Sequence, residues 1–109
     1  MLPKKQRLTK KNLAYLFRKG KTVGNTHLNI RFMKNTRLFS RFSITVSTKI
    51  SKKAVERNLI RRRVYEIIRL NLGTLPQKYD IALITKPSIL KLNFANLKKT
   101  TLHLLKTIH

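Results

Sequence analysis

The sequence predicts an α+β fold, in which a small mixed sheet carries two helices on one face and a first helix at an edge. Residues 27–33 and 41–47 alternate apolar and polar side chains, the period of a half-buried strand. Residues 79–85 are apolar almost throughout, which is typical of a strand inside a sheet. Residues 51–69 and 94–108 carry apolar residues at helical spacing. At 109 residues, the chain is expected to form one domain, residues 1–109, around a single modest core.

The charge balance indicates a polyanionic partner. The chain has 26 Lys and Arg residues against 3 acids, a formal charge of +23. Self-repulsion of that size opposes compaction unless a polyanion is bound. Nucleic acid is the first inference, and an anionic membrane surface is the second. The 41% hydrophobic content and the clear periodicities argue against a disordered basic tail.

The cellular compartment is predicted from what the sequence lacks. It has no cysteine, which excludes disulfides and thiolate metal sites and suits a reducing cytoplasm. The first residues lack the apolar segment of a signal peptide, and no apolar run is long enough to span a bilayer. We therefore expect a soluble, cytoplasmic protein with no membrane partner.

The N-terminal part predicts a short basic lead-in, Pro3 to Leu8, followed by a helix. Thr9 can cap this helix, which runs through Lys19 and stops at Gly20. Three apolar residues share one side of it at i, i+3 and i+4: Leu13, Leu16 and Phe17. The simplest role of these residues is to hold the helix on the sheet.

The two alternating strands are expected to pair as a hairpin. Residues 34–37, between them, are a turn sequence. The faces turned away from the core carry short polar and some basic side chains. Such a surface could accept an extended RNA strand, or it could be ordinary solvent-exposed sheet. A loop at 71–78 leads into the buried strand, which Pro87 ends.

The central helix, residues 51–69, combines a buried side with a cationic one. Ser51 is its expected N-cap. One arc is apolar and comprises Ile60, Val64, Ile67 and Ile68; Lys53 and Arg57 extend this arc beyond the core. The opposite side carries Asn58, Arg62, Tyr65 and Arg69, with Arg61 beside them. A solvated face usually mixes Lys with Glu, whereas Arg61 to Arg63 stand together, and Arg suits bidentate phosphate contact.

Catalytic chemistry within the chain is not expected. The acids are Glu56, Glu66 and Asp80. The two glutamates lie ten residues apart on one helix, about 15 Å along the axis and about 80° around it, too far apart to share a metal pair. His103 and His109 do not share a helix face. The sequence contains no phosphate-binding glycine loop and no zinc-ligand spacing, so neither a catalytic nor a metal site is predicted.

Several stretches together resemble the bacterial ribonuclease P protein family. The signature is carried by residues 46–49, 53–58 and 60–62 and by Glu66, around an Arg-Asn pair followed by a basic cluster. The short helix ending in Phe-x-x-Gly at 17–20 and the order of elements extend the resemblance to nearly the whole chain. Two positions of the central helix depart from the family: Leu59 stands where Arg or Lys is usual, and Tyr65 where Arg is usual. In the first helix, Phe17 keeps the family's aromatic residue, but Leu13 stands where Phe is usual.

The resemblance implies the second-domain fold of ribosomal protein S5, with a left-handed β-α-β crossover around the central helix. It also implies a subunit that assists removal of the 5′ leader from precursor tRNA, while the partner RNA subunit holds the catalytic Mg²⁺. No cofactor of the chain itself and no protein partner are implied. Leader contacts are expected at Leu13, Phe17 and Arg31. Contacts to the RNA subunit are expected at Lys49, Lys53, Arg57, Asn58, Arg61, Arg62, Arg63 and Arg69, of which Arg63 and Arg69 could compensate for the two departures in the central helix.

Two other classes stay open at the level of sequence. A ribosomal or other structural RNA-binding protein would share the charge without needing the Arg-Asn signature. A membrane-active cationic protein would also be basic, although the ordered strand alternation argues against it.

Overall fold

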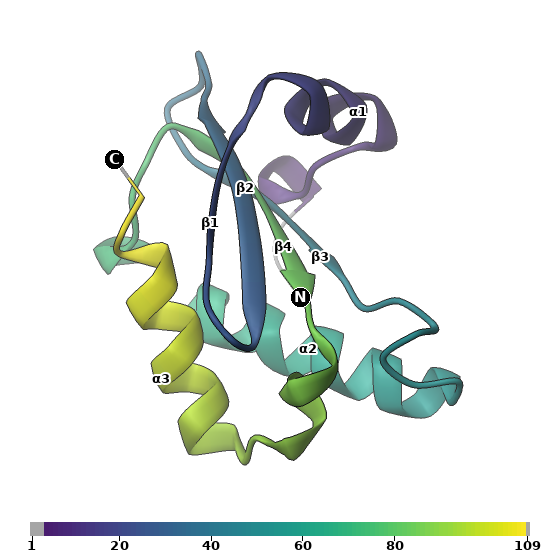
Figure 1. The fold of residues 1–109 in the computed structure, drawn as a ribbon. Helices are drawn as coiled ribbons and strands as arrows, with labels where there is room; N and C mark the ends of the chain where they lie inside the picture. Colours follow the sequence, from purple (N-terminus) through teal and green to yellow (C-terminus); the bar gives the residue numbers. More distant parts are fainter. Residues whose placement is uncertain (1–3, 109) are drawn as a thin grey trace.

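The computed structural model describes residues 4–108, so Pro3 and His109 lie outside it. Its centre is a four-stranded sheet in the order β1-β2-β4-β3 (Figure 1). The strands are β1 Lys21–Gly24, β2 Leu28–Lys34, β3 Arg41–Thr45 and β4 Tyr79–Thr85. Strand β2 is antiparallel to both β1 and β4, whereas β3 is parallel to β4.

Three helices enclose this sheet. They are α1 Lys10–Lys19, α2 Ala54–Leu70 and α3 Phe94–Leu105, with 3₁₀ turns η1 Lys4–Gln6, η2 Leu72–Thr74 and η3 Pro87–Lys91. Helices α2 and α3 pack on one face, as predicted. Helix α1 does not lie at an edge: it sits on the opposite face, against β2 and the inner strand β4. Leu16 anchors the helix: its side chain is fully buried. Burial of a side chain of that size is favourable, and the middle of a sheet is wide enough to cover it completely.

The predicted hairpin between the alternating strands is wrong, because β4 lies between β2 and β3. Strand β4 is buried at six of its seven positions and therefore takes an inner place, while the half-buried strands flank it. Strand β3 reaches its parallel neighbour β4 through α2, behind the sheet in Figure 1, which gives the left-handed crossover. Strand β1 was not predicted; it has no buried residue.

The core lies between the sheet and the pair α2 and α3. The four apolar residues predicted for the arc of α2 are all buried. Tyr65, expected on the polar side, is also buried, with 9% of its surface exposed. It sits at the margin of the apolar arc, and its hydroxyl group reaches the backbone of Ile44. Burial raises the pKa of Tyr65 above its ordinary value.

The ends of α1 follow the sequence closely. Thr9 and Asn12 form a reciprocal capping box at its start. At its end the Gly20 N–H bonds to the carbonyl of Leu16 at 2.8 Å. A Cβ at position 20 would lie 2.7 Å from that carbonyl oxygen, so the close approach requires glycine.

The boundaries of the other two long helices differ from those predicted, at the start of α2 and at the end of α3. Helix α2 begins after Lys53, so Ser51 is not its N-cap. Instead, the Ser51 hydroxyl accepts from Lys53 N at 3.1 Å and donates to Glu56 Oε1 at 2.5 Å, an arrangement that turns the chain before the helix. Helix α3 ends at Leu105, and Ile108 remains buried in the tighter turn that follows.

A buried ion pair joins β3 and β4 on the face that carries α1. Arg41 donates from Nε and Nη2 to the two carboxylate oxygens of Asp80, at 2.8 and 2.7 Å. Asn35 Nδ2 donates to the same carboxylate at 2.9 Å, and Asn12 Oδ1 accepts from Arg41 at 3.2 Å. Both charges are therefore satisfied within the protein.

Candidate RNA-binding surfaces

The first surface is the α2 ladder, which we define as Lys53, Arg57, Asn58, Arg61 and Arg62. The N-terminal half of α2 projects beyond the sheet (Figure 1). Arg57 Nη1 donates to the Ser51 carbonyl at 2.9 Å, and Arg61 Nη1 donates to Asn58 Oδ1 at 2.8 Å. These bonds hold two guanidinium groups without neutralising them. The ladder is thus a row of oriented donors on a rigid element.

Three further predicted cations lie apart from this ladder. Arg63 is about 140° around the axis of α2 from Asn58 and lines a separate hollow with Leu90 of η3. Arg69 is bonded to Glu66, and this hydrogen bond lowers the pKa of Glu66 and raises the pKa of Arg69. Lys49 is exposed in the turn before the helix.

The second surface is the sheet face not covered by α2 and α3. The strand register aligns Arg31 of β2, Ala82 of β4 and Ser43 of β3 in one row. Arg31 is fixed there, because its guanidinium donates to the Leu16 carbonyl at 3.3 Å and to Thr22 Oγ1 at 2.9 Å. Small side chains beside it keep the floor shallow.

Helix α1 forms the wall of this surface. At about 100° per residue, Leu13 and Phe17 lie on one flank of the buried Leu16, and Tyr15 lies on the other. Tyr15 lines a hollow of about 410 Å³ that also contains Arg41 and Asp80. The Tyr15 flank therefore faces the end of the sheet where β3 and β4 begin, and the flank with Phe17 faces the opposite end. Phe17 keeps 42% of its surface exposed.

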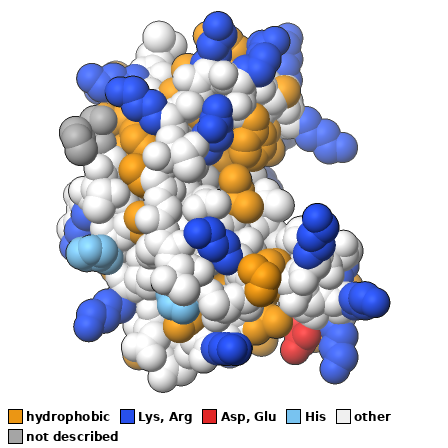
Figure 2. All heavy atoms as spheres, in the orientation of Figure 1, with side chains coloured by type: hydrophobic (Ala, Val, Ile, Leu, Met, Phe, Trp, Pro, Cys, Tyr) orange, Lys and Arg blue, Asp and Glu red, His pale blue; other side chains and the backbone are white. Residues whose placement is uncertain are grey.

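We call this side of the sheet the sheet groove, with Leu13 and Phe17 as wall and Arg31 and Ser43 as floor; Ala82, between them, is buried, with 1% of its surface exposed. Strand β3 runs out of this groove toward the turn that begins α2. Figure 2 shows a recess on this side of the molecule, between the end that carries α1 and the projecting end of α2. Blue Lys and Arg side chains surround it, and red acidic atoms are scarce. The two surfaces are thus adjacent and share one electropositive side.

The structure brings the three predicted leader residues, Leu13, Phe17 and Arg31, to this side of the sheet, and the strand register adds Ser43 and Ala82 beside Arg31. These residues lie side by side because β4 separates β2 from β3. The alternation of apolar and polar residues within each strand does not indicate that strand order. The continuous apolar run of β4, set between two alternating strands, was the available signal.

The acidic residues offer no catalytic constellation. Asp80 is held by Arg41 and Asn35, Glu66 by Arg69, and Glu56 by Ser51. Within residues 4–108, no three His, Cys, Asp or Glu side chains are grouped closely enough to hold a metal ion. Nor is any helix in that range long and apolar enough to cross a membrane. The exposed guanidinium groups and the Phe17 ring are of the types that bind phosphate and stack on bases.

Comparison with known proteins gives one family throughout. The family model described as Ribonuclease P matches residues 2–109. The ribonuclease P protein component of Thermotoga maritima is 32% identical over 103 residues, covering 91% of this chain and 87% of its own. That of Mycoplasma mycoides is 32% identical over 110 residues, covering 96% and 98%. A solved structure of the Thermotoga maritima RNase P protein superposes with a TM-score of 0.88, covering 94% of this chain and 97% of that one.

Proposed function

The chain belongs to the ribonuclease P protein family, and we propose that it binds the catalytic RNA subunit and the 5′ leader of precursor tRNA. In this role, it assists endonucleolytic removal of the leader. The observation that carries the proposal is the adjacency of the α2 ladder and the sheet groove on one electropositive side.

The α2 ladder is assigned to the RNA subunit. Its donors are closely spaced on a helix, and Asn58 fixes the orientation of Arg61. A folded RNA presents phosphates in fixed positions, which such a rigid array of donors can match. Arg62 is exposed and has no hydrogen-bond partner among the described residues, so its guanidinium is available.

The sheet groove is assigned to the leader. An exposed aromatic side chain beside a shallow floor suits an extended single strand, whose bases stack and whose backbone needs positive charge. Phe17 supplies the stacking surface, and Arg31 supplies the charge. Arg31 is already held by α1 and β1, so binding costs little ordering of its side chain.

Catalysis is assigned to the RNA, with Mg²⁺ held there and not by this chain. A two-metal mechanism needs carboxylates around ions about 4 Å apart. The three side-chain carboxylates of this chain instead hold separate structural partners: Asp80 lies on β4, and Glu56 and Glu66 lie ten residues apart on α2. The proposed holoenzyme is cytoplasmic and needs no further protein.

Reconstitution tests this function directly. We expect the purified protein to cleave nothing by itself, and to enhance specific cleavage by the RNA subunit of the same organism at the mature 5′ end. Specific cleavage by protein treated to remove RNA would overturn the assignment of catalysis. An RNA subunit indifferent to the protein would instead favour a structural RNA-binding role.

The leader assignment is tested by Phe17→Ala. Loss of one stacked base costs about 1–3 kcal/mol, so precursor tRNA should bind the assembled holoenzyme about 5- to 150-fold more weakly. Mature tRNA, which lacks a leader, should bind unchanged. The matched control is Tyr15→Ala, which removes an aromatic side chain of similar exposure from the other flank of α1. If both variants keep the preference for precursor over mature tRNA, the leader lies elsewhere.

A further inference from the structure

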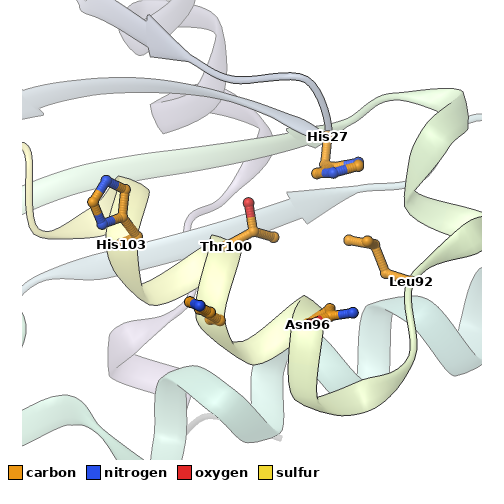
Figure 3. Close-up of a pocket in the computed structure, with 6 residues that line it drawn as sticks. His27, Leu92, Asn96, Thr100 and His103 are labelled. Atoms are coloured by element: carbon orange, nitrogen blue, oxygen red, sulfur yellow. The ribbon is translucent and has the colours of Figure 1, made fainter.

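A second face of α3 carries polar side chains that the proposed function does not use. The buried residues of α3 are Leu97, Thr101, Leu104 and Leu105. Three other positions, Asn96, Thr100 and His103, recur at i, i+4 and i+7, with Lys99 beside them, and so form one stripe. This stripe faces the turn between β1 and β2 (Figure 3).

The stripe lines a hollow of about 490 Å³, which we call the α3 hollow. Its lining residues are His27, Leu92, Asn96, Lys99, Thr100 and His103. The volume lies within the range of small-molecule sites, which is about 300–1,000 Å³. In Figure 3 the labelled side chains come from three segments, the β1–β2 turn, the segment after η3 and α3, and surround one space.

Two hydrogen-bonded contacts hold the hollow open. Asn25 Nδ2 donates to Thr100 Oγ1 at 2.9 Å, which ties the β1–β2 turn to α3. Ser88 Oγ lies 2.9 Å from the Thr26 carbonyl and 2.7 Å from His27 Nδ1. The Ser88 hydroxyl has one proton, and the carbonyl can only accept it, so His27 Nδ1 must donate to Ser88. This fixes the imidazole ring before any ligand arrives.

The remaining polar atoms of the hollow are unused. His27 Nε2 is left as an acceptor in the neutral ring, and Asn96 offers both an amide donor and an acceptor. Within residues 4–108, the side chains of Asn96, Lys99 and His103 have no hydrogen-bond partner. No acidic residue lines the hollow, so Lys99 is not neutralised there.

We infer that the α3 hollow holds one unpaired nucleotide of an RNA, with its base against the imidazole rings and Leu92 and its phosphate at Lys99. Imidazole planes accept stacked bases, and an amide can pair with a base edge. A bare anion would leave Leu92 and Asn96 without a role, whereas an apolar ligand would leave Lys99 buried without a counter-charge. The choice of RNA as the source rests on the proposed function.

Binding to the isolated protein is tested by titrating isotopically labelled protein with adenosine monophosphate and recording NMR chemical shifts. We expect saturable shifts at His27, Asn96 and His103, with adenosine and inorganic phosphate each binding more weakly. His103→Ala should weaken binding at least about fivefold, the lower limit for one stacked base. Lys99→Ala should also weaken binding, because the phosphate loses its cation. The control Lys98→Ala removes the same charge from the neighbouring exposed position outside the hollow.

Three outcomes would overturn the inference. Phosphate shifting the same signals as strongly as the nucleotide would leave only an anion site. Equal losses for Lys98→Ala and Lys99→Ala would indicate diffuse attraction. Absence of saturable shifts would leave an ordinary solvated helix face.

The source of the nucleotide is tested in the assembled holoenzyme by placing the photo-reactive residue p-benzoylphenylalanine at one position at a time. His103→p-benzoylphenylalanine should cross-link to RNA at one site, and Lys98→p-benzoylphenylalanine should not. Cross-linking from Arg62→p-benzoylphenylalanine alone would overturn this inference and leave the proposed function intact. If neither position 62 nor position 103 cross-links, the proposed function fails as well.

Discussion

Replacing Arg62 tests whether the α2 ladder contacts phosphate. Arg62 is exposed on α2, and no carboxylate within residues 4–108 neutralises it. Each phosphate contact contributes about 0.7–0.9 to the slope of log K against log salt. Arg62→Ala should therefore make the slope for binding the RNA subunit shallower by just under one unit, without changing the fold.

Arg69 on the same helix provides an internal comparison. Its guanidinium is bonded to Glu66, so it is less free to contact phosphate. Arg69→Ala should change the salt slope less than Arg62→Ala does, although both remove one positive charge. Lys98→Ala on α3 removes the same charge from a position outside the ladder and should leave the slope unchanged.

The assay is fluorescence anisotropy of labelled RNA subunit, titrated with each variant between about 50 and 200 mM monovalent salt. Thermal melts should agree within about 0.5 kcal/mol of unfolding free energy, as expected of exposed substitutions. An unchanged slope for Arg62→Ala refutes its phosphate contact. Equal changes for all three variants would mean that net charge, and not the ladder, drives binding.

Three further predictions concern stability. Asp80→Ala leaves Arg41 buried without its partner and should cost about 3–5 kcal/mol in chemical denaturation, whereas Glu66→Ala in the exposed pair should cost far less; equal costs would contradict the role of burial. Thr101 is fully buried, and its hydroxyl has no hydrogen-bond partner among residues 4–108, so Thr101→Val should raise the melting temperature, and a lower one would contradict this. Burial raises the pKa of Tyr65 above 10.0, so its contribution to stability is complete below pH 10 and lost as pH rises through the folded-state pKa. The difference in unfolding free energy between wild type and Tyr65→Phe should therefore shrink from pH 9 to pH 11.5, and a constant difference would contradict the shift.

The sequence predicted elements better than it predicted neighbours. The period of two in β2 and β3, the apolar run of β4 and the buried arc of α2 each depend on local residue order, which the sequence displays. The pairing of β2 with β4 depends on which strand can be buried on both faces, a comparison between distant segments. The sheet groove could not be predicted in full for the same reason: Ser43 and Ala82 lie beside Arg31 only because β4 is placed between β2 and β3.

Tyr65 illustrates a different limit. A helical wheel places it near Asn58 and Arg62, and a residue with a hydroxyl is easily read as polar. Its ring is large enough to fill the margin of the core, and its hydroxyl reaches a backbone group of β3. An Arg at position 65 would start from the same margin of the core and would have to extend beyond it to bring its charge to the surface. Helix α2 therefore exposes a shorter basic row on this flank than the sequence suggested.

The placement of the three acids explains why so basic a chain can fold and still present free cations. Asp80 neutralises the guanidinium of Arg41, which is largely buried beside the sheet. Glu56 lies in the first turn of α2, where the helix dipole favours negative charge. Glu66 holds Arg69, at the end of α2 that packs under the sheet. None of the three lies within hydrogen-bond reach of a ladder cation. The few negative charges thus serve the fold, and the repulsion left among the ladder cations favours the binding of a polyanion, which would in turn stabilise this surface.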